Sequence, residues 1–179
     1  MIFLESTLER LARLKTQAAN LLTIMNLAFG GAAILVTMND KFALAVLFIF
    51  VAGLLDRFDG MTARKLGIES ELGKQLDSMS DIISFGIAPA LLIYAYATHE
   101  LGTLAMVVTV MYIASGAFRL ARFNISESNG FFTGLPITAA GVVLTLSYFA
   151  VPYVPAVFYL FFMILLSFMM ISTFSLRKI

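Results

Sequence analysis

The chain contains no cysteine, and His99 is its single histidine. Disulfides, thiol nucleophiles and cysteine-ligated metals are therefore excluded, and so are histidine-rich metal sites. Charged residues are also scarce, at 13% of 179 residues, whereas 60% are hydrophobic. The mean hydropathy of +0.94 lies outside the range of ordinary globular domains. This composition predicts a polytopic helical membrane protein and gives no reason to expect a nucleic-acid partner.

Long apolar runs separated by short polar turns organise the sequence. A membrane-crossing helix needs about 20 mainly apolar residues, and several runs approach or exceed that length. The predicted fold class is all-α, a single domain over residues 1–179 with six transmembrane helices. The bundle covers residues 17–174, with spans at about 17–38, 42–66, 73–97, 103–123 and 136–151 and a sixth ending near 174. Pro89 removes one backbone hydrogen bond, so we expect the third span to kink there.

Residues 1–15 combine apolar and charged residues at helical spacing. Leu4, Leu8 and Leu11 share one face of a helix, and the cations that follow suit anionic lipid headgroups. We predict an N-terminal amphipathic helix that lies on the cytoplasmic membrane surface. A disordered start is the alternative, since chain termini fray.

Lysine and arginine are distributed unevenly between the two sides of the predicted bundle. Six spans place both termini, and the loops after spans two and four, on one side. Eleven of the twelve Lys and Arg residues, all but Lys41, lie on or towards that side. By the positive-inside rule that side is cytoplasmic. The prediction is an integral protein of the cell membrane with cytoplasmic N- and C-termini.

Acidic residues interrupt the apolar sequence where the second span ends and the third begins. On each helix the acids share a face with small residues, because they are spaced i, i+3, i+4, i+7 on the first and i, i+4, i+8 on the second. Side by side, the two helices would direct four carboxylates into one cleft, where they repel one another unless some are protonated or a cation binds. Hard oxygen ligands suit Mg²⁺, Mn²⁺ or Ca²⁺. The positions are Asp56, Asp59, Gly60 and Ala63, then Gly73, Asp77 and Asp81.

With Arg64 these residues match the pattern D-x2-D-G-x2-A-R-x8-G-x3-D-x3-D over 26 residues. The pattern resembles the motif of the CDP-alcohol phosphatidyltransferases, integral membrane enzymes of phospholipid synthesis. The resemblance implies one or two divalent cations, Mg²⁺ or Mn²⁺, held by Asp56, Asp59 and Asp77. It implies that Asp81 is the general base and also contacts metal. A carboxylate among other carboxylates suits that base, since it can accept a hydroxyl proton near neutral pH. A homodimer is a further implication of the family.

The resemblance also implies a CDP-linked lipid substrate, with the cytidine near the small residues of the motif. Small side chains let a bulky ligand approach the backbone, and cations near the acids suit a pyrophosphate. Asn26, on a polar track of the first span, is the residue of that track that we expect to face the nucleotide, although such residues also form helix–helix hydrogen bonds. The candidate CDP-lipid-binding residues are Asn26, Gly60, Ala63, Arg64, Gly73 and Lys74.

The alternative interpretation of the acids is a set of structural ion pairs with Arg57, Arg64 and Lys74. An intramembrane acid costs roughly 2.5–3.5 kcal/mol on insertion scales, and such residues are usually functional. Ion pairing also leaves the small residues on the same helix faces without a reason. The functional interpretation is therefore favoured.

Two arginines end the fourth span, level with the acidic cleft. Arg119 and Arg122 are i, i+3 neighbours, followed by Asn124. They are either topology anchors that reach lipid phosphate or an anion-binding pair for the lipid phosphate of the substrate or for an acceptor carboxylate. The runs at 20–26, 81–90, 118–124 and 134–136 resemble the phosphatidylserine synthase branch of the family. That resemblance implies transfer from CDP-diacylglycerol to L-serine, with release of CMP.

Three alternatives to serine transfer stay open from the sequence. Another acceptor, such as glycerol phosphate or an inositol phosphate, would preserve the same acidic motif. An archaeal ether lipid could replace the diacyl lipid. Outside the enzyme class, a divalent-cation transporter could use the acids as a transport site, but it would need a path to the outer side, where the spans carry no charged residue.

Overall fold

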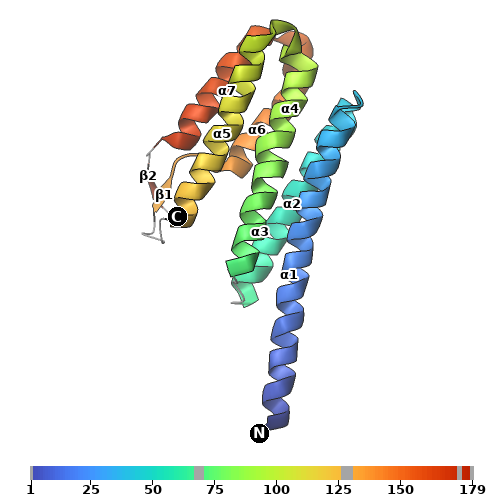
Figure 1. Ribbon diagram of the computed structural model, residues 1–179, viewed down its shortest axis with the longest axis vertical. Coiled ribbons are helices and arrows are strands. Elements are labelled where there is room, and N and C mark those ends of the chain that lie inside the picture. The colour runs from blue at the N-terminus through green and yellow to red at the C-terminus, as the bar shows by residue number, and fades with distance from the viewer. Residues whose placement is uncertain (1, 67–70, 126–130, 173–174, 178–179) are drawn as a thin grey trace.

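A computed structural model gives the fold of residues 2–66, 71–125, 131–172 and 175–177, with side chains described for 17, 20–58, 60–61, 71–125 and 134–172. The chain folds as antiparallel helices of unequal length, with a short strand pair formed by residues 131–133 and 175–177 (Figure 1). The α-helices are α1 (Ile2–Thr37), α2 (Phe42–Leu66), α3 (Glu71–Asp81), α4 (Ala88–Ile93), α5 (Thr103–Ile125), α6 (Ile137–Leu146) and α7 (Ala156–Ile171). Between them lie the π-helices η1 (Ile82–Ile87) and η2 (Tyr94–Thr98), the 3₁₀-helices η3 (His99–Leu101) and η4 (Ser147–Tyr153), and the strands β1 (Phe131–Thr133) and β2 (Ser175–Arg177).

The first helix corrects one sequence prediction. We expected an interfacial helix over 1–15 and a separate span from residue 17, but α1 is one continuous helix of 36 residues. The segment 15–20 contains neither glycine nor proline, and two alanines lie within it. Without a helix-breaking residue the backbone continues regularly. At 1.5 Å per residue α1 is about 54 Å long, well beyond the hydrocarbon thickness of a bilayer.

The predicted third span is helical throughout, but its geometry changes along its length. The chain passes from α3 through η1 into α4, and then through η2 and η3. Pro89 lies near the start of α4, so the irregularity that it imposes falls in the π-helical turn before it. At that turn the Ala88 N–H bonds to the Ile83 carbonyl, five residues earlier. The helix is therefore π-helical directly before the turn that contains Pro89, as at sites where a residue is inserted in a helix, and the kink at Pro89 stays a prediction.

The core consists of two apolar clusters that meet at α4. The larger cluster joins η1 and α4 to α5, α6 and α7, and it includes the buried side chains of Phe85, Tyr112 and Met163. The smaller cluster joins α1, α2 and α4 through residues such as Ile49 and Leu92. Helix α6 contacts α2, α4 and η1 on one side and α5 and α7 on the other. The short helix α6 thus connects the two halves of the bundle.

A small antiparallel ribbon pairs a segment before α6 with a segment after α7, and it was not predicted. Strand β1 pairs with β2 so that Phe131 lies opposite Arg177 and Thr133 lies opposite Ser175. Strand β1 lies between the predicted fourth and fifth spans, and α7 ends at Ile171, before the predicted end of the sixth span near 174. Apart from this ribbon, the elements of the described ranges are helical.

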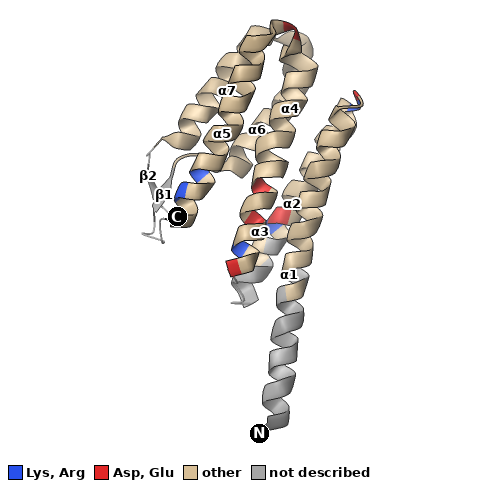
Figure 2. Ribbon diagram, in the orientation of Figure 1, with Lys and Arg blue, Asp and Glu red and all other residues tan. Residues whose placement is uncertain are grey.

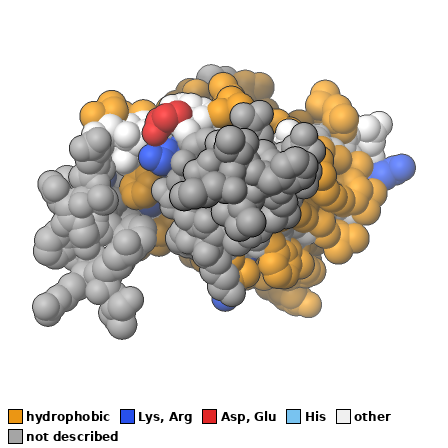
Figure 3. Space-filling view, turned by 90° about the horizontal axis from the view of Figure 1, so that it is seen from below, with side chains coloured by type: hydrophobic (Ala, Val, Ile, Leu, Met, Phe, Trp, Pro, Cys, Tyr) orange, Lys and Arg blue, Asp and Glu red, His pale blue; other side chains and the backbone are white. Residues whose placement is uncertain are grey.

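The described helices have the length and surface of an integral membrane protein. Three stretches are long and apolar enough to cross a bilayer, at Asn20–Thr37, Glu71–Leu101 and Thr103–Ile125, and two shorter apolar helices cover Ile137–Tyr153 and Ala156–Ile171. Large hydrophobic side chains point outward from several helices, and they form much of the visible flank when the molecule is viewed from the α1 end (Figure 3). The charged side chains that the structure describes lie towards the two ends of the bundle (Figure 2). Six spans remain a prediction.

Candidate active site

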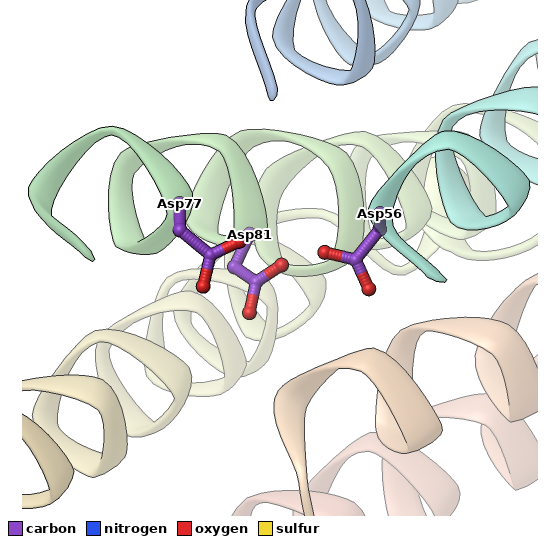
Figure 4. Close-up of side chains that lie close together, drawn as sticks. All are labelled: Asp56, Asp77 and Asp81. Atoms are coloured by element: carbon purple, nitrogen blue, oxygen red, sulfur yellow. The ribbon is translucent and has the colours of Figure 1, made fainter. Parts of the chain in front are cut away.

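Three aspartates from two helices converge at one end of the bundle. Asp56 comes from α2, and Asp77 and Asp81 lie one turn apart on α3. One carboxylate oxygen of each lies within 4.8 Å of the others, and the three side chains face the same space (Figure 4). Asp56 and Asp81 are half-buried and Asp77 is exposed. The separation suits oxygen ligands of a single hard cation, which would offset the repulsion among the carboxylates.

Helix α1 is joined to the acid-bearing segment by two hydroxyls on one face. Ser80 donates to the Thr23 carbonyl at 3.3 Å, and Ser84 donates to the Asn26 carbonyl at 3.2 Å. One turn beyond Asn26, a Cβ at Gly30 would overlap the Ser84 side chain, so the two backbones approach closely there. These contacts fix α1 beside α3 and η1. They identify Ser80 and Ser84 as positioning residues that the sequence analysis missed, although their i, i+4 spacing matches that of the acids.

Asn26 is fully buried, at 0% exposure. Its side-chain Nδ2 and Oδ1 make no hydrogen bond within the described part of the chain. A buried amide without protein partners is costly unless a ligand or water satisfies it. The predicted nucleotide contact thus lies on the helix face that packs against η1.

The turn beyond the acids is secured by a tyrosine from α5. Proline has no N–H, so in an α-helix Pro89 would leave the carbonyl four residues earlier, that of Phe85, without its usual donor. The Tyr112 hydroxyl donates to the Phe85 carbonyl at 3.4 Å. On the other side a Cβ at Gly141 would lie 2.5 Å from the same oxygen, so only glycine lets α6 approach this closely. Pro89 was identified from the sequence, but Tyr112 and Gly141, which lie against the Phe85 carbonyl, were not.

The two predicted arginines have different surroundings. Arg119 is buried, at 6% exposure. Its Nε makes no hydrogen bond to a described residue. Arg122 is directed to the end of α7, where Nη1 donates to the Ile171 carbonyl at 3.1 Å and Nη2 to the Ser172 carbonyl at 3.3 Å. Arg119 is therefore buried within the bundle, whereas Arg122 binds the end of α7.

The end of α7 is surrounded by further backbone contacts. The Leu135 N–H bonds to the Met169 carbonyl at 3.0 Å. Gly134 has φ +77°, and a Cβ there would lie 2.6 Å from the Met170 carbonyl. A side chain is disfavoured at this position both by the left-handed backbone and by the contact. Arg122 thus belongs to the contacts that join the start of α6 to the end of α7.

Some of the remaining predicted site residues have described side chains and others do not. Asn124 donates to the Ser78 hydroxyl at 2.9 Å, which joins the end of α5 to α3 beside Asp77. Lys74 pairs with Glu71 at 3.3 Å on the exposed face of α3. Gly60 and Gly73 are half-buried on α2 and α3. The side chains of Asp59, Ala63 and Arg64 lie outside the described residues, so their predicted roles stay predictions.

The fold and the site together define a class of protein: an integral membrane protein with a carboxylate site, formed by two helices, that can hold a metal ion. The sequence profile of the CDP-alcohol phosphatidyltransferases matches residues 16–176. The chain belongs to this family of enzymes, as the motif resemblance predicted.

Individual relatives give finer comparisons. The chain is 40% identical over 127 residues to the CDP-diacylglycerol–serine O-phosphatidyltransferase of Bacillus subtilis, which covers 70% of this chain and 72% of that protein. It is 36% identical over 130 residues to the protein of the same name from Helicobacter pylori, covering 71% of this chain and 55% of that protein. It is also 36% identical over 163 residues to the archaetidylserine synthase of Methanothermobacter thermautotrophicus, covering 89% of this chain and 69% of that protein. The matched region thus spans about half to three quarters of the length of these relatives.

Proposed function

We propose that the protein transfers the phosphatidyl group of CDP-diacylglycerol to the hydroxyl of L-serine and releases CMP. The observation that carries this proposal is the convergence of Asp56, Asp77 and Asp81, whose carboxylate oxygens lie within 4.8 Å of one another. The names of the relatives from Bacillus subtilis and Helicobacter pylori support serine as the acceptor.

The donor set fits a hard divalent cation. Carboxylate oxygens on two helices can ligate Mg²⁺ or Mn²⁺, and no cysteine is present to favour a softer metal. Asp56 and Asp77 would hold the cation, with Asp59 as a further ligand and Asp81 in contact with it. The bound cation would supply charge stabilisation for the pyrophosphate.

Asp81 is the proposed general base. It is half-buried at the inner side of the cluster, where α3 passes into η1. From there it would take the proton of the serine hydroxyl as the oxygen attacks the lipid-side phosphorus. The bond from that phosphorus to the bridging oxygen breaks, and CMP leaves with the electron pair. The predicted nucleotide residues are Asn26, Gly60, Ala63, Arg64, Gly73 and Lys74.

The proposed setting is a six-span protein of the cell membrane, with both termini and the acidic cluster on the cytoplasmic side. The distribution of lysine and arginine in the sequence supports this orientation. The acyl chains of the substrate would stay in the bilayer while the nucleotide reaches the cluster from the cytoplasm. A homodimer is proposed from the family alone.

A second candidate substrate has a different lipid part. The relative named archaetidylserine synthase covers more of this chain than the Bacillus subtilis enzyme does. All three relatives have serine in their names, whereas the two bacterial names specify diacylglycerol and the archaeal name specifies an archaetidyl lipid. Serine is therefore better supported than the diacyl core.

One experiment tests the proposed function. Detergent-purified protein is incubated with Mg²⁺ or Mn²⁺, CDP-diacylglycerol or its ether-lipid counterpart, and one acceptor at a time from L-serine, glycerol phosphate and inositol phosphate. CMP release that depends on serine is the expected result, and the matched control is Asp56→Asn, which alters one carboxylate of the cluster. Release with glycerol phosphate or inositol phosphate but not serine would overturn the acceptor. Divalent-cation flux through reconstituted vesicles, without CMP release, would favour the alternative that the protein is a divalent-cation transporter.

A further inference from the structure

The carbonyl oxygen of Phe85 meets two helices just beyond the acidic cluster. Phe85 follows Asp81 by four residues and belongs to the π-helix η1. Tyr112 of α5 donates its hydroxyl to this oxygen at 3.4 Å. From α6, a Cβ added at Gly141 would lie 2.5 Å from the same oxygen and 2.7 Å from the Phe85 Cα. The position of this carbonyl is therefore limited both by a hydrogen bond from α5 and by backbone packing against α6.

The hydrogen bond from Tyr112 lies inside the bundle. Tyr112 and Phe85 are both fully buried, at 0% exposure. In such surroundings water does not readily replace a lost donor, and a buried carbonyl without a donor is costly. π-Helices are rare, and they appear mostly as single turns, frequently at functional sites. The Tyr112 hydroxyl is therefore placed to hold η1 in its present form.

Asp56 and Asp81 reach the acidic cluster from different helices. Figure 4 shows Asp56 on α2 pointing towards Asp77 and Asp81, which share α3. Regular α-helical geometry fixes Asp81 relative to Asp77, one turn earlier, but it does not fix Asp81 relative to α2. That second relation depends on where η1 packs, because Asp81 is the last residue of α3 and η1 begins at the next residue.

We propose that Tyr112 is a positioning residue for the transfer reaction, which sets the place of Asp81 relative to Asp56 through the Phe85 carbonyl. This inference rests on the proposed function, in which Asp81 is the general base. Reaction rates depend steeply on placement, and a misplacement of about 1 Å can cost about 10²-fold. A small shift of η1 should therefore lower turnover, although no group that touches a substrate is lost. Binding of CDP-diacylglycerol should change much less than turnover.

The test uses Tyr112→Phe, which removes the hydroxyl and keeps the ring. CMP release from CDP-diacylglycerol with L-serine and Mg²⁺ is measured for the parent, Tyr112→Phe, Asp81→Asn and the double variant. In Tyr112→Phe the kcat should fall roughly 3–10-fold, the range for one lost hydrogen bond, and the KM for CDP-diacylglycerol should stay within about twofold of the parent. In the Asp81→Asn background the same change should lower kcat by less than about twofold, because no base is left to position.

The matched control is Tyr159→Phe, the same change at a second buried tyrosine. Tyr159 of α7 is also at 0% exposure, and its hydroxyl donates to the Ser147 carbonyl at 3.0 Å. Ser147 belongs to η4, which carries none of the acids. The two variants should show a similar fall in Tm, since each loses one buried hydrogen bond. The kcat of Tyr159→Phe should stay within about twofold of the parent, as expected for a distant and independent position.

Two results would overturn the inference. In the first, Tyr112→Phe leaves kcat as unchanged as Tyr159→Phe does. In the second, it lowers kcat by the same factor with Asp81 and with Asn at that position, which would give Tyr112 a general structural role. If Tyr112→Phe does not fold, Gly141→Ala decides in the same four-variant comparison, because its methyl would displace the same carbonyl, and equal losses in both backgrounds again overturn the inference. A parent without serine-dependent CMP release contradicts the proposed function itself, whereas an active parent with an unaffected Tyr112→Phe contradicts this inference alone.

Discussion

The two ends of the bundle carry similar charged residues in different arrangements. At the end where α1 meets α2 and the α4–η3 segment meets α5, Asp40, Lys41, His99 and Glu100 are all exposed in turns. At the other end Asp56 and Asp81 are half-buried and their carboxylates approach each other from separate helices. Figure 2 shows the acidic and basic residues at both ends. The comparison teaches that convergence of acids from different elements, rather than the presence of charge, distinguishes a site from a solvated turn.

Removal of the metal from the acidic cluster should have the largest effect on activity. Excess EDTA is expected to lower CMP release by roughly 10³-fold or more, because a cation supplies several kcal/mol of charge stabilisation. Added Mg²⁺ or Mn²⁺ should restore it. Full turnover in excess chelator would contradict a metal role for the carboxylates. The acidic cluster would then not differ from the exposed charged turns at the other end.

Asp81→Asn should have the next largest effect. The amide keeps the size of the side chain and removes the basic oxygen, so turnover should fall by about 10²-fold, a typical contribution of general-base catalysis. CDP-diacylglycerol binding, measured by calorimetry with Mg²⁺ present, should change little. An equal loss of lipid binding would make Asp81 principally a ligand, and near-parental turnover would exclude it as the base.

Substitutions in the packing between α6 and η1, next to the site, should have smaller effects than substitutions of the acids. In Gly141→Ala the new methyl would meet the Phe85 carbonyl at 2.5 Å, and overpacking of this kind costs about 1–3 kcal/mol. We expect the Tm to fall by roughly 3–10 °C. Gly31→Ala is the matched control, because a Cβ there meets nothing within 4 Å. Equal Tm changes in the two variants would contradict the close approach of α6 to η1.

Substitutions at the exposed end should have the smallest effect. Glu100→Gln and Lys41→Gln alter exposed turn residues, and such changes rarely affect stability. We expect unchanged KM values and a Tm within about 2 °C of the parent. A large loss of activity in either variant would remove the functional distinction between the two ends.

Much of the fold could be predicted because apolar runs and turns define helices in a membrane. The span at 103–123 agrees closely with α5, and the turns around 39–41 and 99–102 lie where the structure has them. The continuity of α1 could not be predicted, because its amphipathic start indicated a helix in the membrane plane and spacing alone does not show where one helix ends. The β1–β2 ribbon was missed because three-residue strands have no periodic signal.

The acids of the site could be predicted because their spacing places them on helix faces. Asp56, Asp77 and Asp81 converge as expected. The division between Arg119 and Arg122 could not be predicted, since i, i+3 neighbours point to similar sides and only the position of α7 separates them. Tyr112 and Gly141 were missed for a related reason. Both lie against the carbonyl of Phe85, which belongs to another helical segment, so their significance depends on tertiary packing.

The π-helical turn at Ile82–Ile87 has a consequence for changes in chain length. A π-helical turn accommodates one residue more than an α-helical turn, so it sets the rotation of α3 relative to α4. A one-residue deletion there would be absorbed if the turn closed into a regular α form, so Asp81 and Pro89 would keep nearly the same relative orientation. The same deletion within the regular α-helix α3 would instead turn the residues on its two sides by about 100° relative to each other, the angle of one residue at 3.6 per turn. Single-residue deletions should therefore be tolerated better in this π-helical segment than in α3, where they would separate the faces that carry Asp77 and Asp81.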